Sequence, residues 1–420
     1  MQPKFLPLVL AAILHSPLLV AEPFQTDAPA NNAARPALLT LQSAMEMALQ
    51  QNREIAAASR EVDAVDGAVQ QAGKIPNPEL SYIVEGGRQP TRTSTIQLNQ
   101  PIELGGKRSA RMNTATSSRE VASMELAVKR LDIRAITVTA FYGVLIAHEQ
   151  HRLAMESLEL AQRATNATAK RVVAGKISPV EESKARIAES TARLELTQAA
   201  GNLASSRQRL ASTLGTTQAL FGQVTGELQV LPPIPALELL IDRLKDSPAY
   251  QRARWEVSRR IGLTDIERAK QIPDVVLAVG RKKDEQLSYS QPIVGVSIAI
   301  PIFDRNQGNV REAAHRVEKA QEELAATEIQ LHADITQAYQ QFNVARDEVV
   351  LLQKDVIPGA QRVYEAAAKG FDYGKLSYLD MLDAQRTLAQ AKLQYLRVLS
   401  DMVRAASELE RLVGPLDFLK

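Results

Sequence analysis

Residues 306–357 read NQGNVREAAHRVEKAQEELAATEIQLHADITQAYQQFNVARDEVVLLQKDVI, and this stretch limits how the whole chain can fold. Apolar residues recur every seven positions in two series that lie four positions apart, as in the seam of a coiled coil. The first series is Val310, Val317, Leu324, Leu331, Ala338, Ala345 and Leu352, and the second is Ile335, Phe342, Val349 and Val356. No glycine or proline occurs from residue 310 to 357. A helix of about 48 residues is roughly 70 Å long, so it needs equally long partner helices.

The composition of the 420 residues favours one elongated molecule of mixed charge. There are 50 lysines and arginines against 48 aspartates and glutamates, and both signs are spread along the chain. This balance gives no reason to expect nucleic acid as a partner. Cysteine is absent, which excludes disulfides, thiolate metal sites and cysteine nucleophiles.

The first 21 residues are typical of a cleaved secretory signal. Lys4 precedes an almost wholly apolar run over residues 5–21, and a polar stretch follows. We expect cleavage between Ala21 and Ala30, and the alternative is a buried apolar helix. No run of 18 apolar residues occurs elsewhere, so a helical membrane span is not expected.

Residues 38–214 are predicted to form a first structural repeat. A helical pattern from Thr40 stops at Gly73, and two segments of alternating polarity within residues 78–101 predict a β-hairpin. A second helical pattern then continues to about Val173, a length of roughly 65 residues. The chain turns at residues 174–179 and returns as a helix to Leu214.

The same order of elements is predicted again for residues 237–414, after a linker over residues 215–236 that is rich in glycine and proline. The second hairpin is expected within residues 274–301, and the long helix quoted above follows it. Matching phrases lie about 200 residues apart, which indicates an internal duplication. They are Ile75-Pro76 with Ile272-Pro273, Pro101-Ile102 with Pro301-Ile302, and Gly175-Lys176 with Gly374-Lys375.

The four predicted strands have one apolar face and one face of small or polar residues. Within a bilayer an open sheet edge would leave backbone groups without partners, so the strands would have to close into a barrel shared between chains. Two chains would supply about eight strands and three chains about twelve, and the small polar inner faces favour the larger barrel with an open lumen. A small soluble sheet is the alternative.

At this point the chain resembles a known family, the TolC-type outer membrane efflux factors. The resemblance covers residues 38–414. It rests on the two predicted hairpins that each precede a long helix and on four phrases, found at residues 39–44 (LTLQSA), 100–108 (QPIELGGKR), 301–308 (PIFDRNQG) and 379–385 (LDMLDAQ). The two phrases that contain Pro-Ile are the ones that bear on the branch of the family, and they are similar to the branch that serves cobalt-zinc-cadmium and related cation exporters. The resemblance implies a mainly α fold, in which a twelve-stranded β-barrel in the outer membrane continues into a trimeric α-barrel of helical hairpins in the periplasm.

The resemblance also implies the partners and the functional residues. The partners would be a periplasmic adaptor protein, an inner membrane pump of the resistance-nodulation-division class that is driven by protons, and the lipid of the outer membrane. Asp380 and Asp383 match the acidic rings that narrow the periplasmic aperture in the family, although aspartate is also favoured near any helix N-terminus. The turns containing Gly175, Lys176, Gly374 and Lys375 would be the tips that dock the adaptor. Leu376 stands where some relatives have a latching arginine, so that latch is not expected here.

No motif of a nucleophilic enzyme, phosphate-binding loop or dinucleotide-binding turn is present, so we expect neither an enzyme nor a cofactor. His148 and His151 lie one helical turn apart, but without a third ligand they predict a solvated surface and no metal site. Two alternatives to a duct for heavy-metal cations remain. One is the same duct serving drugs or type I protein secretion, and the other is a periplasmic coiled-coil scaffold without a barrel.

Overall fold

The computed structural model describes residues 38–86, 91–219, 221–228, 234–285 and 289–416. The predicted signal segment, its cleavage region and Gly87 of the first hairpin turn lie outside these residues. The described part is mainly helical, and it has one four-stranded sheet and one two-stranded sheet. A mainly α fold with long helices and a small share of strands is thereby confirmed.

The elements before the linker begin with a short strand and end with a helical hairpin. They are β1 (Leu38–Leu39), α1 (Leu41–Gln51), α2 (Arg53–Ala72), β2 (Glu79–Glu85), β3 (Thr93–Ile102), α3 (Lys107–Val173) and α4 (Pro179–Thr213). Thr40 and Ser178 cap the N-termini of α1 and α4 through their side chains. Pro179 occupies the first turn of α4, where its missing N–H has no helical partner to lose.

The later elements begin in the linker and end with a second helical hairpin. They are β4 (Gln223–Val224), α5 (Leu237–Asp242), the 3₁₀ turn η1 (Arg243–Asp246), α6 (Pro248–Lys270), β5 (Val275–Asp284), β6 (Tyr289–Ile298), α7 (Gln307–Leu351), the π-helical turn η2 (Leu352–Val356), α8 (Ile357–Asp372) and α9 (Tyr378–Val413). The long helix of the heptad pattern is therefore divided at η2. Pro358 follows directly, and its ring would clash with the carbonyl of Lys354 in a regular helix, which a π turn relieves.

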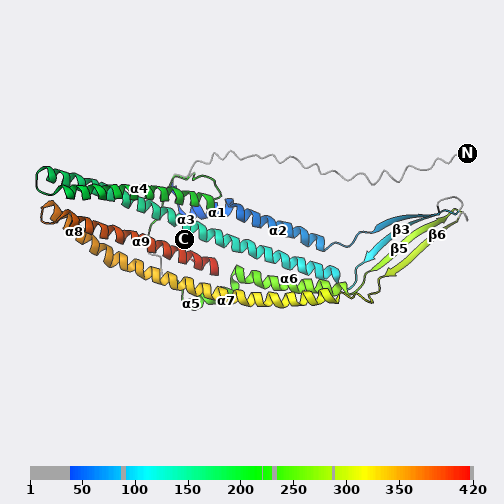
Figure 1. Cartoon of the computed structure of the whole chain (residues 1–420). Coiled ribbons are helices and arrows are strands. Elements are labelled where there is room, and N and C mark those ends of the chain that lie inside the picture. Colours follow the sequence, from blue (N-terminus) through cyan, green and yellow to red (C-terminus); the bar gives the residue numbers. More distant parts are fainter. Residues whose placement is uncertain (1–37, 87–90, 220, 229–233, 286–288, 417–420) are drawn as a thin grey trace, which may run out of the picture. The chain divides into compact units, whose positions relative to one another are not determined.

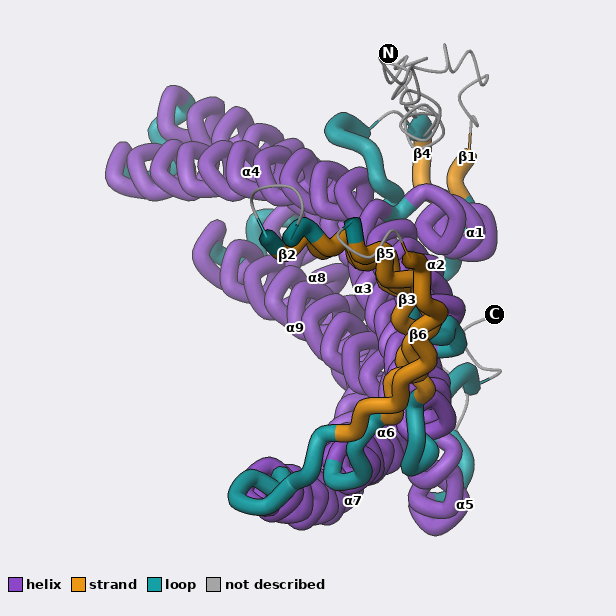
Figure 2. Tube along the Cα trace, turned by 90° about the vertical axis from the view of Figure 1, so that its right-hand side faces the viewer, coloured by secondary structure: helices purple, strands orange, loops and turns teal. Residues whose placement is uncertain are grey.

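The four long strands form one antiparallel sheet in the order β2-β3-β5-β6 (Figure 2). Its register pairs Leu98 with both Leu80 and Val279, so the two hairpins are aligned across their junction. Within residues 38–416 the sheet lies at one end of α3, and both helical reversals lie at the other end (Figure 1). Strands β2 and β6 form the edges of the sheet within one chain.

The apolar core lies where the long helices cross the segments near the middle of the chain. One cluster joins α7 and α9 with Leu240 and Leu244, and it contains the heptad residues Leu331, Ile335 and Phe342. A second cluster joins α1, α3 and α4 with the small sheet of β1 and β4, which pair in parallel. The heptad positions Val310, Val317 and Leu324 are only half-buried, so the first part of the α7 seam is only partly covered within one chain.

Helix α3 contains a window of 18 residues with a mean hydropathy of 1.3, and half of this window is buried. By length and composition it is the one helix among the described residues that could cross a membrane. Partial burial against other helices is the usual situation of a core helix, so this window gives no argument for a helical span.

Candidate functional site

The sheet has one exposed apolar face and one less exposed polar face. Along β5, Leu277 and Val279 are exposed while Ala278 and Gly280 are half-buried. The apolar face contains the cross-strand row Leu80, Leu98, Val279 and Val294, and the opposite face contains rows that include Glu79, Asn99, Ser81 and Gln97. The alternation of exposure indicates a curved sheet whose apolar side is convex. A sheet of this kind can place apolar side chains toward lipid and small polar ones toward a lumen.

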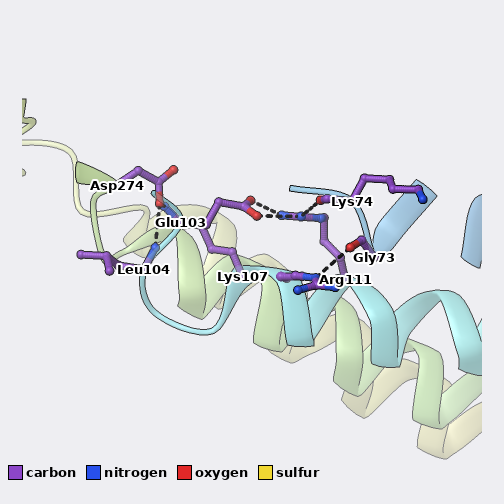
Figure 3. A network of polar contacts seen from close by, with 8 residues as sticks. Gly73, Lys74, Glu103, Leu104, Lys107, Arg111 and Asp274 are labelled. Carbon is purple, nitrogen blue, oxygen red and sulfur yellow. Dashed lines mark hydrogen bonds and ion pairs between the residues drawn. The ribbon is translucent and has the colours of Figure 1, made fainter. Parts of the chain in front are cut away.

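The junction between the sheet and the helices is held by a polar network (Figure 3). The Asp274 carboxylate accepts hydrogen bonds from the Leu104 backbone N–H at 3.1 Å and from the Lys107 ammonium at 2.6 Å. Asp274 precedes β5, whereas Leu104 lies between β3 and α3 and Lys107 is the first residue of α3. The pair therefore joins the two β-hairpins at the point where strands become helices.

A second part of the same network ties α3 to the end of α2. Arg111 donates to both carboxylate oxygens of Glu103 and to the backbone carbonyl of Lys74 (Figure 3). The hydrogen bond from Arg111 holds the pKa of Glu103 below its ordinary value. Arg108 donates to the carbonyl of Gly73 at 2.8 Å. Bidentate pairs of this kind fix orientation, so the hairpin and the helices are joined rigidly.

The two helical reversals have the same backbone geometry. Gly175 and Gly374 adopt φ of 68° and 70°, which a residue with a side chain rarely does. The N–H of Lys176 bonds the carbonyl of Arg171, and the N–H of Lys375 bonds the carbonyl of Gly370, so both helices end in the same way. The exposed turns present Lys176 and Lys375 at the end of the molecule that lies opposite the sheet (Figure 1).

Asp380 and Asp383 lie in the first two turns of α9, just after the second reversal. The Asp380 carboxylate accepts hydrogen bonds from the Ser377 hydroxyl at 2.7 Å and from the Ser377 N–H at 3.0 Å. These bonds, the hydroxyl first, hold the pKa of Asp380 below its ordinary value. Asp380 is therefore half of a capping box. Asp383 is exposed one helical turn further on.

An apolar cluster and one arginine hold the two reversals together. Phe371, Tyr378 and Met381 of the second hairpin pack with Ala164 and Ala185 of the first. The rings of Phe371 and Tyr378 meet edge to face, with centroids 6.2 Å apart. The hydroxyls of Thr168 and Tyr378 are buried near this end of the helices, and neither has a hydrogen-bond partner within the described part of the chain. In an ordinary protein core nearly all buried polar groups form hydrogen bonds, so these two hydroxyls are an exception to that pattern.

Arg171 is the residue of this region that sequence reasoning missed. Its guanidinium donates to the Phe371 carbonyl at 2.8 Å and lies 4.2 Å from the centroid of the Phe371 ring. Its signal in the sequence is weak, because a cation in the last turn of a helix is common on electrostatic grounds alone.

The pair His148 and His151 does not join a larger set of metal ligands. Glu149, which lies between them, is bound by Arg152, and this hydrogen bond holds the pKa of Glu149 below its ordinary value. Among the residues that the structure describes, no group of three histidines or carboxylates is placed to hold a metal ion. The absence of a resident metal stays a prediction.

A buried ion pair also lies outside the predicted site. Glu410 is 1% exposed, and it accepts hydrogen bonds from Arg134 at 3.1 Å and from the Leu416 N–H at 3.0 Å. The pair links α3 and α9 and holds the segment after α9 against the core. Its position inside an apolar cluster indicates a structural role.

Comparisons with known proteins agree with this geometry. A family model described as outer membrane efflux protein matches residues 44–216 and 239–415. The chain is 43% identical to the cobalt-zinc-cadmium resistance protein CzcC of Cupriavidus metallidurans over 99% of this chain and 100% of the relative. It is 27% identical to the nickel-cobalt-cadmium resistance protein NccC of Alcaligenes xylosoxydans xylosoxydans over 81% of this chain and 79% of the relative.

Solved structures of outer membrane channels have the same fold. The chain matches the outer-membrane channel OprN with a TM-score of 0.77 at 17% identity, covering 89% of each chain. It matches the outer membrane protein VceC of Vibrio cholerae with a TM-score of 0.75 at 18% identity, covering 89% of this chain and 96% of the other.

Proposed function

This chain belongs to the outer membrane efflux protein family, and from that premise we propose that it is the exit duct of a tripartite exporter of divalent heavy-metal cations. Its place is the outer membrane, from which the helices extend into the periplasm. We choose heavy-metal cations as the cargo because the chain is 43% identical, over its whole length, to a relative named for cobalt-zinc-cadmium resistance. A conduit of this kind needs no catalytic group, and we propose none.

The packing of the helices supports a closed tube made of several copies. Near the reversals α3 packs against α4 and α9, and α9 packs against α8, so α4 and α8 are the outer helices of the row. Val180, Ile187 and Leu194 recur every seven residues on α4, and each is more than half exposed. On the other side Val356 and Val363 are also exposed and seven apart. The stripe on α4 of one copy can pack against the stripe at η2 and α8 of the next.

The sheet supports the same assembly. One chain offers four strands with edges at β2 and β6. In a bilayer each edge must find a partner, because no water is present to bond its N–H and C=O groups. Three copies supply twelve strands, enough to surround a lumen rather than to fill it with side chains.

The end with the helical reversals is proposed as the docking and gating end. The turns with Gly175, Lys176, Gly374 and Lys375 would contact a periplasmic adaptor, which in turn would connect the duct to an inner membrane pump of the resistance-nodulation-division class. Asp383, together with Asp380, would line the aperture. Repeated around a threefold axis, these carboxylates would attract cations and repel anions.

The test is growth of a strain that lacks the gene, and of the same strain complemented, across graded zinc, cobalt, cadmium and nickel and across a panel of dyes and antibiotics. We expect sensitivity to one or more of the cations, reversed by complementation, and unchanged growth on the organic compounds. Sensitivity to the organic compounds alone would overturn the choice of cargo and leave the duct in place. A protein that urea or carbonate washes from the membrane would overturn the duct itself.

A further inference from the structure

The convex face of the sheet ends in a group of cations at the hairpin turns. Beyond the apolar row of Leu80, Leu98, Val279 and Val294 the next row consists of Tyr82, Ile96, Arg281 and Pro292. The row after that consists of Val84, Ser94, Lys283 and Ser290. Arg92 and Glu285 then face each other, because the Glu285 N–H bonds the Arg92 carbonyl at 3.0 Å.

These cations lie on the side that faces lipid. Side chains alternate across a strand, so Arg281 and Lys283 share the face of Leu277 and Val279. All four are exposed, whereas Lys282, on the other face, is half-buried. Arg281 and Lys283 are therefore separated from the lumen by the sheet itself.

The position of the cations along the strand places them at the outer boundary of the apolar band. From Val275 to Arg281 the strand advances about 20 Å along its own axis, which the tilt of about 40° that is usual in membrane barrels reduces to about 15 Å of height. Ile300 and Phe303 are also exposed and extend the apolar surface toward the helices. Membrane barrels usually have an apolar band about 25 Å tall with aromatic residues at its limits, and Tyr82 lies in the same row as Arg281. Because the helices lie in the periplasm, this end of the band reaches the outer leaflet.

The charges of this group are not balanced within the chain. Lys283 pairs with Glu285 at 2.8 Å. Among the described residues the other ion pair at this end joins Lys282 to Glu85 at 3.6 Å, and neither pair includes Arg92 or Arg281. A guanidinium at the edge of hydrocarbon keeps its stem in the apolar layer and directs its head to the polar boundary. It needs an anionic partner there, and its planar fork fits a phosphate with two parallel hydrogen bonds.

We infer that Arg92, Arg281 and Lys283 form a binding surface for phosphate-bearing lipids of the outer leaflet. The occupant is a lipid and not a protein, since the surface continues the apolar rows that already face the bilayer. The inference rests on the outer membrane location and not on the cargo, so it stands or falls independently of metal export.

The test uses the purified, delipidated full-length protein in detergent, titrated with bisphosphorylated lipid A and with the same lipid freed of its phosphates. Bound lipid is counted by native mass spectrometry. We expect the wild type to prefer the phosphorylated form by about tenfold or more, and Arg281→Gln with Lys283→Gln to lose that preference. The matched control is Lys282→Gln, on the same strand but the opposite face, which should keep it.

Four results would overturn the inference. The first is equal binding of both lipids to the wild type, and the second is an undiminished preference for the phosphorylated lipid in the double variant. The third is a loss of this preference in Lys282→Gln that is as large as in the double variant. The fourth is complete displacement of the lipid by millimolar inorganic phosphate, which would indicate a site for free anions. If the double variant fails to assemble, the single variants Arg281→Gln and Arg281→Lys decide. Arg281→Gln should lose most of the preference for the phosphorylated lipid, whereas Arg281→Lys, which keeps the positive charge, should retain it. Equal binding preferences in these two variants would contradict a role of the charge at position 281.

Discussion

The guanidinium of Arg171 lies 4.2 Å from the ring centroid of Phe371 and donates to the carbonyl of the same residue. The two residues are 200 positions apart in the chain, one at the end of α3 and one at the end of α8. Leu376 follows the second reversal and has no charge with which to form a similar contact. Arg171 thus ties the first helical hairpin to the second.

Replacing Arg171 by methionine is expected to loosen the periplasmic end. The apolar stem is kept, while the hydrogen bond and the cation–π contact, together about 1–2 kcal/mol, are lost. Reconstituted in planar bilayers, the variant should show a higher mean conductance and more frequent open events than the wild type. Lys170→Met, an exposed neighbour, is the control, and identical conductance of Arg171→Met and the wild type would contradict a clamp.

The capping box at Asp380 predicts a pH dependence of the first turn of α9. The folded-state pKa lies below the ordinary value, so the stabilisation is complete above about pH 4 and is lost as the pH falls through the lowered pKa. Amide exchange, corrected for intrinsic rates, should show stronger protection in the wild type than in Asp380→Asn at pH 7 and no difference at the acidic limit. Asp383→Asn should behave as the wild type, and equal protection of all three at pH 7 would refute the effect.

Charge at the aperture is expected to set ion selectivity. Changing both Asp380 and Asp383 to asparagine removes two carboxylates from each chain near the proposed axis, so the preference for cations should fall. The reversal potential in a salt gradient measures this, and it should move toward zero. Because Asp380 also caps the helix, Asp383→Asn alone is the informative single variant. Asp372→Asn, an exposed charge at the end of α8, is the control, and unchanged selectivity of the double variant would remove both residues from the throat.

The exposed stripe on α4 predicts where copies meet. Ile187→Asp places a charge in an interface that would bury a whole isoleucine side chain, worth about 1.5–3 kcal/mol in each of the contacts. We expect a large shift from trimer to monomer in multi-angle light scattering of the detergent-solubilised protein. Ala200→Asp, exposed on the same helix but on a different face from the stripe, should remain trimeric. An intact Ile187→Asp trimer would mean that another face closes the tube.

The junction between strands and helices should be sensitive to Lys107. Its side chain is 15% exposed, and Lys107→Met would leave the Asp274 carboxylate without its ammonium partner, at a cost of about 1–3 kcal/mol. The temperature at which the trimer dissociates should fall by several degrees in a gel-shift assay. Lys74→Met is the control, since only the backbone carbonyl of Lys74 takes part in the network. If the dissociation temperature fell equally in both variants, the cause would be general destabilisation and not the loss of the Lys107–Asp274 ion pair.

The sequence was sufficient to predict the long helices, because only a long helix in a coiled coil keeps apolar residues in register every seven positions over many turns. Leu331, Ile335, Phe342 and Val349 are buried as the seam required. The π turn before Pro358 was not predicted, since a proline more often ends a helical pattern than distorts it. The pairing of β1 with β4 was also missed, because two-residue strands show no period.

The strands are longer than their apolar pattern indicated. β6 begins at Tyr289, five residues before the regular apolar alternation that starts at Val294, and β5 continues through Arg281, Lys282 and Lys283. Backbone hydrogen bonds between neighbouring strands hold these residues in the sheet. Beyond the apolar band their side chains no longer alternate between apolar and polar, so the sequence pattern does not show that the strands continue. The contacts of Arg171 and of Glu410 could not be predicted, because their partners are set by how distant helices meet. The roles of Asp380 and Asp383 in an aperture stay predictions.

The open edges of the β2-β3-β5-β6 sheet also decide how defects would be inherited. No single chain can complete a barrel, so insertion into the membrane and association of the copies have to occur as one event. A chain with a damaged hairpin that still associates would spoil every assembly it enters. When normal and damaged chains are made in equal amounts and mix at random, only about one trimer in eight is wholly normal. Lesions in the hairpins should therefore be genetically dominant, whereas lesions that prevent association should be recessive.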